Sequence, residues 1–177
     1  MALNRSPLTA AQQVALVVLR TLVGWHFLYE GLYKLWAPAW SRAGAPLAPW
    51  SSAGYLRGAS GPLAGLFHAV AASPLLPYVD MAMPVALAAV GLLLMLGLFT
   101  RAACIGALCL LALFYVSAIP TSGALQHGAE GAYLLVSKNL IEAAAVAVLL
   151  TFHTGRMAGL DLLRARPSRV DARPEAA

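Results

Sequence analysis

Four apolar stretches, set apart by polar or proline-rich segments, dominate the sequence and predict four membrane-spanning helices. They cover residues 12–34, 81–100, 102–119 and 133–153. Each is close to the ~20 residues with which an α-helix crosses the hydrocarbon core of a bilayer. Because almost no turn separates the second and third stretches, these two helices are expected to be antiparallel neighbours. The pattern therefore predicts an all-α fold, a four-transmembrane-helix bundle.

The segment between the first two spans, residues 36–79, has a different pattern. Prolines at six positions divide it into short pieces. Tryptophans, which favour the membrane–water boundary, lie in it and beside it. Two short helices are predicted, over residues 50–58 and 62–72, with Pro62 suited to the first turn of the second. We expect this helical insert to lie on the bilayer surface as an extracytoplasmic cap.

The composition indicates an integral membrane protein. Hydrophobic residues make up 60% of the chain, and charged residues only 11%. Soluble domains contain about 45–50% and roughly 25% of these two classes. The formal net charge of +5 does not indicate nucleic-acid binding, because the basic residues are dispersed. The partner that the composition favours is the lipid bilayer.

The arginines predict the orientation in the membrane. Four spans place both termini on one side, and this side carries seven arginines, whereas the other carries three basic residues. By the positive-inside rule we expect both termini to be cytoplasmic, which in a bacterial cell means the cytoplasmic membrane with the insert on its periplasmic face. Residues 1–153 then form one membrane domain. Residues 154–177 form an Arg- and Pro-rich cytoplasmic tail, expected to be disordered beyond its first turns.

Ionisable residues within two of the spans are the main candidates for a site. On the first span they occupy less than half of the helix circumference, at about 100° per residue, and so form a polar face. The last span carries polar groups in its first half. Charge within a membrane is costly and is normally turned toward the protein interior. The candidate residues are Arg20, His26, Glu30, Lys34, Lys138, Asn139 and Glu142.

Matching the depths of these groups predicts how they pair. At a rise of about 1.5 Å per residue, Glu30 and Lys138 lie about 6–8 Å below the outer surface. His26 and Glu142 lie about 12–13 Å below it. We therefore expect Glu30 to pair with Lys138, and His26 with Glu142. Arg20 lies deeper, and it either reaches Glu142 or extends toward the cytoplasmic boundary.

Two interpretations of this polar face compete. In the first, the groups are buried ion pairs and hydrogen bonds that hold two spans in register, worth about 1 kcal/mol each. In the second, they line a pocket for a polar head group, since ionisable residues within a membrane are functional candidates by default. Arg, His and Lys donate to carbonyl oxygens, Glu and His pass protons, and Trp25 and Tyr29 can stack on a flat ring. That combination suits a quinone, among other ligands.

Several other cofactors lack a signature in the sequence. Cys104 and Cys109 are five residues apart, about 140° around a helix, so we do not expect them to bridge. No CxxC motif occurs. Only His26 is clearly within the membrane, so a haem lacks a second axial histidine. No nucleotide fingerprint and no Cys/His spacing for a metal site such as zinc are present.

Four segments carry a family resemblance. The insert contains SAGYLRGASGPLAGLF at 52–67, the second span ends in LGLFTR at 96–101, and the last span begins with KNLIE at 138–142. The matching residues of the first span are Arg20, Gly24, Phe27, Gly31 and Lys34. Together these features resemble the DoxX/DoxD family of small four-span membrane proteins, and the insert is similar to the stretch that marks the DoxD-like branch.

The resemblance implies a haem-free four-helix membrane subunit. The DoxD branch is associated with thiosulfate:quinone oxidoreductase, which oxidises thiosulfate to tetrathionate and delivers electrons to a membrane quinone. There a DoxD-like chain works with a second, DoxA-like part, for which this sequence has no room after its last span. The alternative is a non-catalytic scaffold or accessory subunit that docks a partner through the insert. A small-solute carrier is disfavoured by four spans without an inverted repeat.

Overall fold

The computed structural model describes residues 8–36, 50–119, 132–133 and 136–164. This part of the chain is mostly helical. Its elements are α1 (Ala10–Trp36), α2 (Ala53–Arg57), α3 (Ala64–Ala71), α4 (Leu76–Leu96), α5 (Thr100–Ser117), β1 (Ala132–Tyr133), β2 (Val136–Ser137), α6 (Lys138–Phe152), the 3-10 helix η2 (Thr154–Arg156) and α7 (Asp161–Arg164).

Three helices, α1, α4 and α5, are long and apolar enough to cross a membrane. The helix of the predicted fourth span, α6, has 15 residues. Its rise of about 22 Å is shorter than the ~30 Å of a bilayer core. We expected this helix to begin near residue 133, but it begins at Lys138, because β1 and β2 pair in an antiparallel ladder just before it. The Ser137 side chain caps α6 by accepting from the Leu140 N–H.

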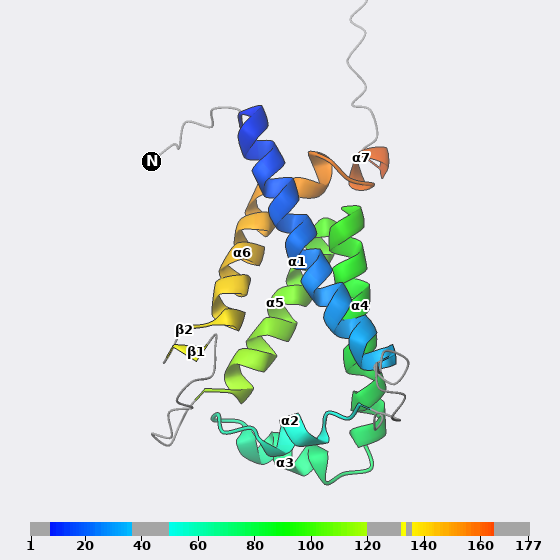
Figure 1. Ribbon diagram of the computed structural model, residues 1–177, viewed down its shortest axis with the longest axis vertical. Coiled ribbons are helices and arrows are strands. Elements are labelled where there is room, and N and C mark those ends of the chain that lie inside the picture. The colour runs from blue at the N-terminus through cyan, green and yellow to red at the C-terminus, as the bar shows by residue number, and fades with distance from the viewer. Residues whose placement is uncertain (1–7, 37–49, 120–131, 134–135, 165–177) are drawn as a thin grey trace, which may run out of the picture.

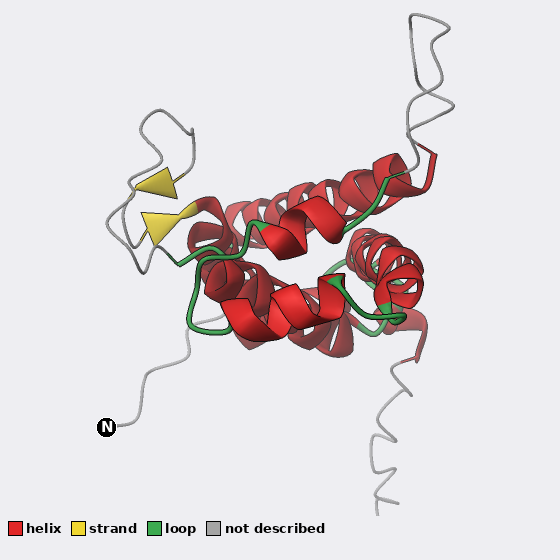
Figure 2. Cartoon of the chain, turned by 90° about the horizontal axis from the view of Figure 1, so that it is seen from below, coloured by secondary structure: helices red, strands yellow, loops and turns green. Residues whose placement is uncertain are grey.

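The long helices and α6 form a bundle (Figure 1). α1 packs along α4, α4 packs on α5, and α5 packs along α6, whereas α1 and α6 meet over a much shorter stretch. The start of α1 lies with α7 at one end of the bundle, and α2 and α3 cross the other end (Figure 1). Figure 2 views the molecule from the α2–α3 end. The two short helices predicted within the insert are present, over shorter ranges.

Glycines bring α1 and α4 into backbone contact. A Cβ added to Gly91 of α4 would lie 2.6 Å from the Gly24 carbonyl oxygen and 2.7 Å from the Cα of Leu28, both on α1. A Cβ on Gly31 would lie 2.6 Å from the carbonyl oxygen of Pro84. Small residues allow such close approach in membrane bundles, where dispersion contacts replace the hydrophobic effect as the main attraction between helices. The α1–α4 pair is therefore the most tightly closed seam around the site.

Arg20 binds at the α7 end of the bundle, so of the two alternatives predicted for it the contact with Glu142 is wrong, and its side chain extends instead toward the end where α1 begins. Its side chain is buried, and the guanidinium donates to the carbonyl oxygens of Thr154 at 2.8 Å and Ala158 at 2.5 Å. These carbonyls follow the end of α6, where the chain turns through a left-handed residue, His153. Arg20 thus connects α1 to the segment that follows α6.

Asp161 supplies the N-terminal cap of α5, which has no capping side chain of its own. Its carboxylate accepts from the N–H groups of Phe99 at 2.8 Å and Thr100 at 3.0 Å. The same segment pairs with the α4–α5 turn, since the Asp161 N–H donates to the Gly97 carbonyl oxygen. A carboxylate here also lies at the positive end of the α5 dipole.

Replacing Asp161 by Ala is expected to lower the free energy of unfolding by about 0.5–2 kcal/mol, because two N–H groups lose their acceptor. Thermal unfolding in detergent, followed by circular dichroism, measures the loss. Asp161→Asn is the matched control, since it keeps an acceptor oxygen, and we expect it to lose less. An unchanged transition in Asp161→Ala would show that the cap has no stabilising role.

Candidate functional site

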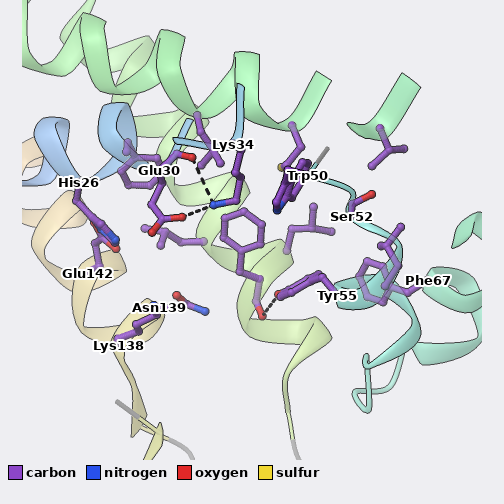
Figure 3. Close-up of a pocket in the computed structure, with 18 residues that line it drawn as sticks. His26, Glu30, Lys34, Trp50, Ser52, Tyr55, Phe67, Lys138, Asn139 and Glu142 are labelled. Atoms are coloured by element: carbon purple, nitrogen blue, oxygen red, sulfur yellow. Dashed lines mark hydrogen bonds and ion pairs between the residues drawn. The ribbon is translucent and has the colours of Figure 1, made fainter. Parts of the chain in front are cut away.

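A cavity of about 320 Å³ lies between α1, α4, α5, α6 and the α2–α3 segment (Figure 3). Its volume is at the lower end of the range of about 300–1,000 Å³ that small-molecule sites occupy. Six of the seven sequence-predicted residues line it, and Arg20 is the exception. They are His26, Glu30 and Lys34 from α1, and Lys138, Asn139 and Glu142 from α6.

The predicted pair of His26 and Glu142 is confirmed. Nδ1 of His26 lies 2.7 Å from Oε1 of Glu142. The Glu142 side chain is 13% exposed and the His26 side chain 44% exposed. The pair therefore joins α1 to α6 at the cavity wall.

The predicted pair of Glu30 and Lys138 is wrong. The Glu30 carboxylate instead binds the ammonium group of Lys34, one turn further along the same helix. Such i,i+4 neighbours are in reach without any packing between helices, whereas at this level the cavity separates α1 from α6. The Lys34 ammonium also lies 5.7 Å from the centre of the Trp50 ring, a cation–π contact.

Lys138 and Asn139 are the donors of the polar wall that remain available. Within the ranges that the structure describes, neither side chain has a hydrogen-bond or ion-pair partner. Both line the cavity from the first turn of α6. An ammonium group and an amide N–H₂ at this place can donate to a carbonyl oxygen or to an oxyanion of a ligand.

The opposite wall is apolar. It includes Phe27 from α1, Met83 and Leu87 from α4, and Leu111 and Phe114 from α5. In Figure 3 His26 and Glu142 lie together at one side of the cavity, and Tyr55 and Phe67 lie at the other. A site with hydrogen-bonding groups on one wall and rings and aliphatic side chains on the other fits a flat molecule with polar atoms along its edge.

The roof of the cavity comes from residues that the sequence analysis did not predict, namely Trp50, Ser52, Tyr55, Leu56 and Phe67. The segment that carries them has a small core of its own, formed by α2 and α3. We call residues 50–71 the cap. The signal that could have found its anchor is Asp80, a lone acid at the start of an apolar stretch, which needs a partner there.

Asp80 of α4 is the first anchor of the cap. Its carboxylate accepts from the Ser52 N–H at 2.7 Å, the Ser52 hydroxyl at 2.5 Å and the Ser51 hydroxyl at 2.8 Å. Hydrogen bonds to an ionised acceptor are about twice as strong as neutral ones. The bonds fix the start of the cap against α4.

Ser117 at the end of α5 is the second anchor. Its carbonyl oxygen accepts from the N–H groups of Ser60 at 3.1 Å and Gly61 at 3.3 Å, and its hydroxyl lies 2.5 Å from the Tyr55 hydroxyl. Burial raises the pKa of the Tyr55 hydroxyl above its ordinary value, and the hydrogen bond to Ser117 only partly offsets that rise. Tyr55 therefore stays neutral and available for this contact at physiological pH.

Replacing Asp80 by Ala is expected to loosen the cap, because the Ser52 N–H loses a charged acceptor. A hydrogen bond to a charged group is worth about 1.5–3 kcal/mol, so amide exchange of residues 52–59 should accelerate at least about tenfold. Hydrogen exchange with mass spectrometry measures this rate. Tyr55→Phe, which loses only the hydroxyl contact, should give a smaller acceleration, and an unchanged rate in Asp80→Ala would contradict the anchor.

The described part of the chain shows neither a candidate metal site nor a disulfide bond. No group of three His, Cys, Asp or Glu side chains is placed to hold a metal ion there. Cys104 is buried and Cys109 is exposed, and the two are not bridged. The expectation that they do not bridge is confirmed, whereas only Cys104 is a buried thiol.

Comparisons with known proteins identify no relative of this chain. No protein-family model, no curated protein and no solved structure matches the chain. The resemblance to the DoxX/DoxD family therefore stays a prediction from the sequence.

Proposed function

We propose that this chain is the membrane subunit of a quinone-linked oxidoreductase, and that the cavity binds the quinone head group. One observation carries the proposal: six of the predicted polar residues, three from α1 and three from α6, line a single cavity whose remaining lining is largely apolar. If these groups were only structural pairs between spans, their own side chains would fill the space between α1 and α6.

The chemistry of the two walls matches the parts of a quinone. The Lys138 ammonium and the Asn139 amide donate to one carbonyl oxygen of the head group. The His26–Glu142 pair lies beside the other and supplies a proton as the quinone is reduced. Reduction takes up two electrons and two protons, so a proton-exchanging pair within the membrane has a direct use.

The electron donor that we propose is thiosulfate. Two thiosulfate ions join through a sulfur–sulfur bond to give tetrathionate, and the two electrons released reduce one quinone to a quinol. This part of the proposal rests on the DoxD-like insert and the resembling spans, and it includes a second, DoxA-like chain that meets the aqueous donor.

The membrane arrangement is part of the proposal. α6 and its flanking residues make a fourth crossing, the cap lies on the outer face of a bacterial cytoplasmic membrane, and both termini are cytoplasmic. It is supported by the position of the α1 start and α7 at one end of the bundle and of the cap at the other (Figure 1), together with the bias of arginines toward the α7 end.

The direct test uses the purified full chain in lipid nanodiscs. Titration with decyl-benzoquinone, followed by tryptophan fluorescence, is expected to saturate with one site per chain. Addition of thiosulfate and the second chain is then expected to give quinol and tetrathionate in equal amounts. The double variant Lys138→Ala and Asn139→Ala should bind the quinone more weakly. Absence of saturable binding would overturn the proposal.

The alternative is an accessory subunit that docks a partner through the cap. The observation in its favour is that α3 and its N-terminal boundary expose apolar side chains, Leu63 at 45% and Leu66 at 60%. Affinity capture with wild type and with the double variant Leu63→Ser and Leu66→Ser separates the two functions. A scaffold loses its partner in the variant, whereas quinone binding in the cavity is unaffected.

A further inference from the structure

Four pairs of neighbouring helices surround the cavity in the described part of the molecule, and we call the line of contact within each pair a seam. Three of these seams are closely packed and one is open. Between α1 and α4 the backbones touch at Gly24, Gly31 and Gly91. α4 and α5 are joined by a tight turn, and α5 packs along α6. The remaining seam lies between α1 and α6, which come together toward the α7 end and diverge toward the cap (Figure 1).

The cap covers the cavity at the α2–α3 end of the bundle. The cap is fixed to α4 through Asp80 and to α5 through Ser117. Its side chains Trp50, Tyr55 and Phe67 lie over the cavity (Figure 3). A ligand that came from water would have to displace a segment with two anchors and its own core.

The α1–α6 seam is open to the side of the bundle. His26 and Glu30, which line the cavity, keep 44% and 41% of their side chains exposed. Both lie in a helix long and apolar enough to cross a membrane, so the surface beside them faces lipid. The His26–Glu142 pair crosses this seam and marks the end of the opening nearer the bilayer centre.

An apolar stripe runs along α1 beside the opening. Leu22, Tyr29 and Tyr33 lie within about 60° of His26 around the helix. Their exposed fractions are 61%, 44% and 41%. The rings of Tyr29 and Tyr33 stack with centroids 6.1 Å apart, which makes a continuous flat surface. The stripe runs beside the polar residues of α1, from Tyr33 at the cap end to Leu22 near the middle of the helix.

We propose that the ligand enters sideways from the bilayer through the α1–α6 seam, and that it is an amphiphile whose hydrocarbon tail lies on the Leu22–Tyr29 stripe while its head occupies the cavity. This inference rests on the proposed function, and within it the substrate is a long-tailed, membrane-dissolved quinone. Among the described residues, the α1–α6 seam is the opening through which the tail of a head group at the His26–Glu142 level can reach the surface of the bundle.

The test compares two quinones with the same head group, one with a decyl tail and one with none, on the full chain in nanodiscs. The double variant Leu22→Ala and Tyr29→Ala is expected to raise the Kd of the tailed quinone about fivefold to tenfold, since it removes apolar contact area from the tail. Neither Leu22 nor Tyr29 lines the cavity, contrary to the ring-stacking role predicted for Tyr29, so the Kd of the tailless quinone should not change. The matched control is Met81→Ala with Val85→Ala, two exposed apolar side chains on α4 outside the cavity lining, and it should leave both Kd values unchanged.

The outcomes separate the two proposals. If both quinones bind but the stripe variant leaves the tailed one unaffected, or weakens both equally, lateral access is overturned and the quinone site stands. If neither quinone binds the wild-type chain, the proposed function and the inference fail together. A selective loss of the tailed quinone in the stripe variant alone supports the inference.

Discussion

Replacement of both His26 and Glu142 by Ala is expected to weaken quinone binding about 10-fold to 100-fold and to abolish quinone reduction. The head group loses the hydrogen-bonding side chains of both residues at the cavity wall, and a bond to a charged group is worth about 1.5–3 kcal/mol. The variant also lacks the His26–Glu142 hydrogen bond, 2.7 Å long, that joins α1 to α6. Titration in nanodiscs gives the affinity, and the absorbance of quinol gives the rate.

A conservative variant separates binding from proton transfer. Glu142→Gln keeps an oxygen that accepts from the His26 ring but cannot take up a proton at neutral pH. It is expected to change the Kd of the quinone less than about threefold and to lower the rate of reduction much more. Thr151→Ala, an exposed position near the other end of α6, is the control for both measurements. Undiminished reduction in the double Ala variant would remove His26 and Glu142 from the site.

Gly91→Ala is expected to cause a large loss of stability, because the added methyl group meets backbone rather than a movable side chain. The new Cβ would lie against the backbone of α1, 2.6 Å from the Gly24 carbonyl oxygen and 2.7 Å from the Cα of Leu28. Backbone cannot rotate away as a side chain does, so the two helices must separate. We expect a loss near the upper end of the ~1–3 kcal/mol that overpacking costs, or beyond it.

Gly106→Ala is the matched control for this variant. Gly106 also lies in a helix long and apolar enough to cross a membrane, α5, but its added Cβ would meet only the Cγ2 of Val90, at 3.3 Å. The gain in helix propensity, up to about 1 kcal/mol, offsets such a contact. Thermal unfolding of both variants in the same detergent makes the comparison. Equal stabilities would show that α1 and α4 are not in backbone contact.

The sequence was sufficient for the features that depend on length and depth. Runs of apolar residues predicted α1, α4 and α5, because the thickness of a bilayer sets the length of a spanning helix. The rise per residue placed His26 and Glu142 at one level, and they pair. Both arguments use one dimension only, the position along the membrane normal, which a linear sequence reports directly.

Features that depend on lateral distance were not predictable in this way. Glu30 and Lys138 share a level, but Glu30 binds Lys34, because depth does not say how far apart two helices lie. The cap is held over the cavity by Asp80 and Ser117. These residues are far from each other and from the cap's contact points in the sequence, so their contacts could not be predicted from local pattern. Gly24 and Gly31, seven residues apart and so on one side of α1, were a signal for the α1–α4 contact that the sequence analysis did not use.

The clamp around Arg20 has a consequence for how the chain assembles in the membrane. The guanidinium of the first helix finds its acceptors only 134 and 138 residues later, at Thr154 and Ala158. While the ribosome is still making α6, this cation has neither acceptor and must keep its hydration, and α1 remains free to shift along its axis. The register of the first helix is therefore fixed last, once the segment after α6 has emerged and exchanged that water for two backbone oxygens.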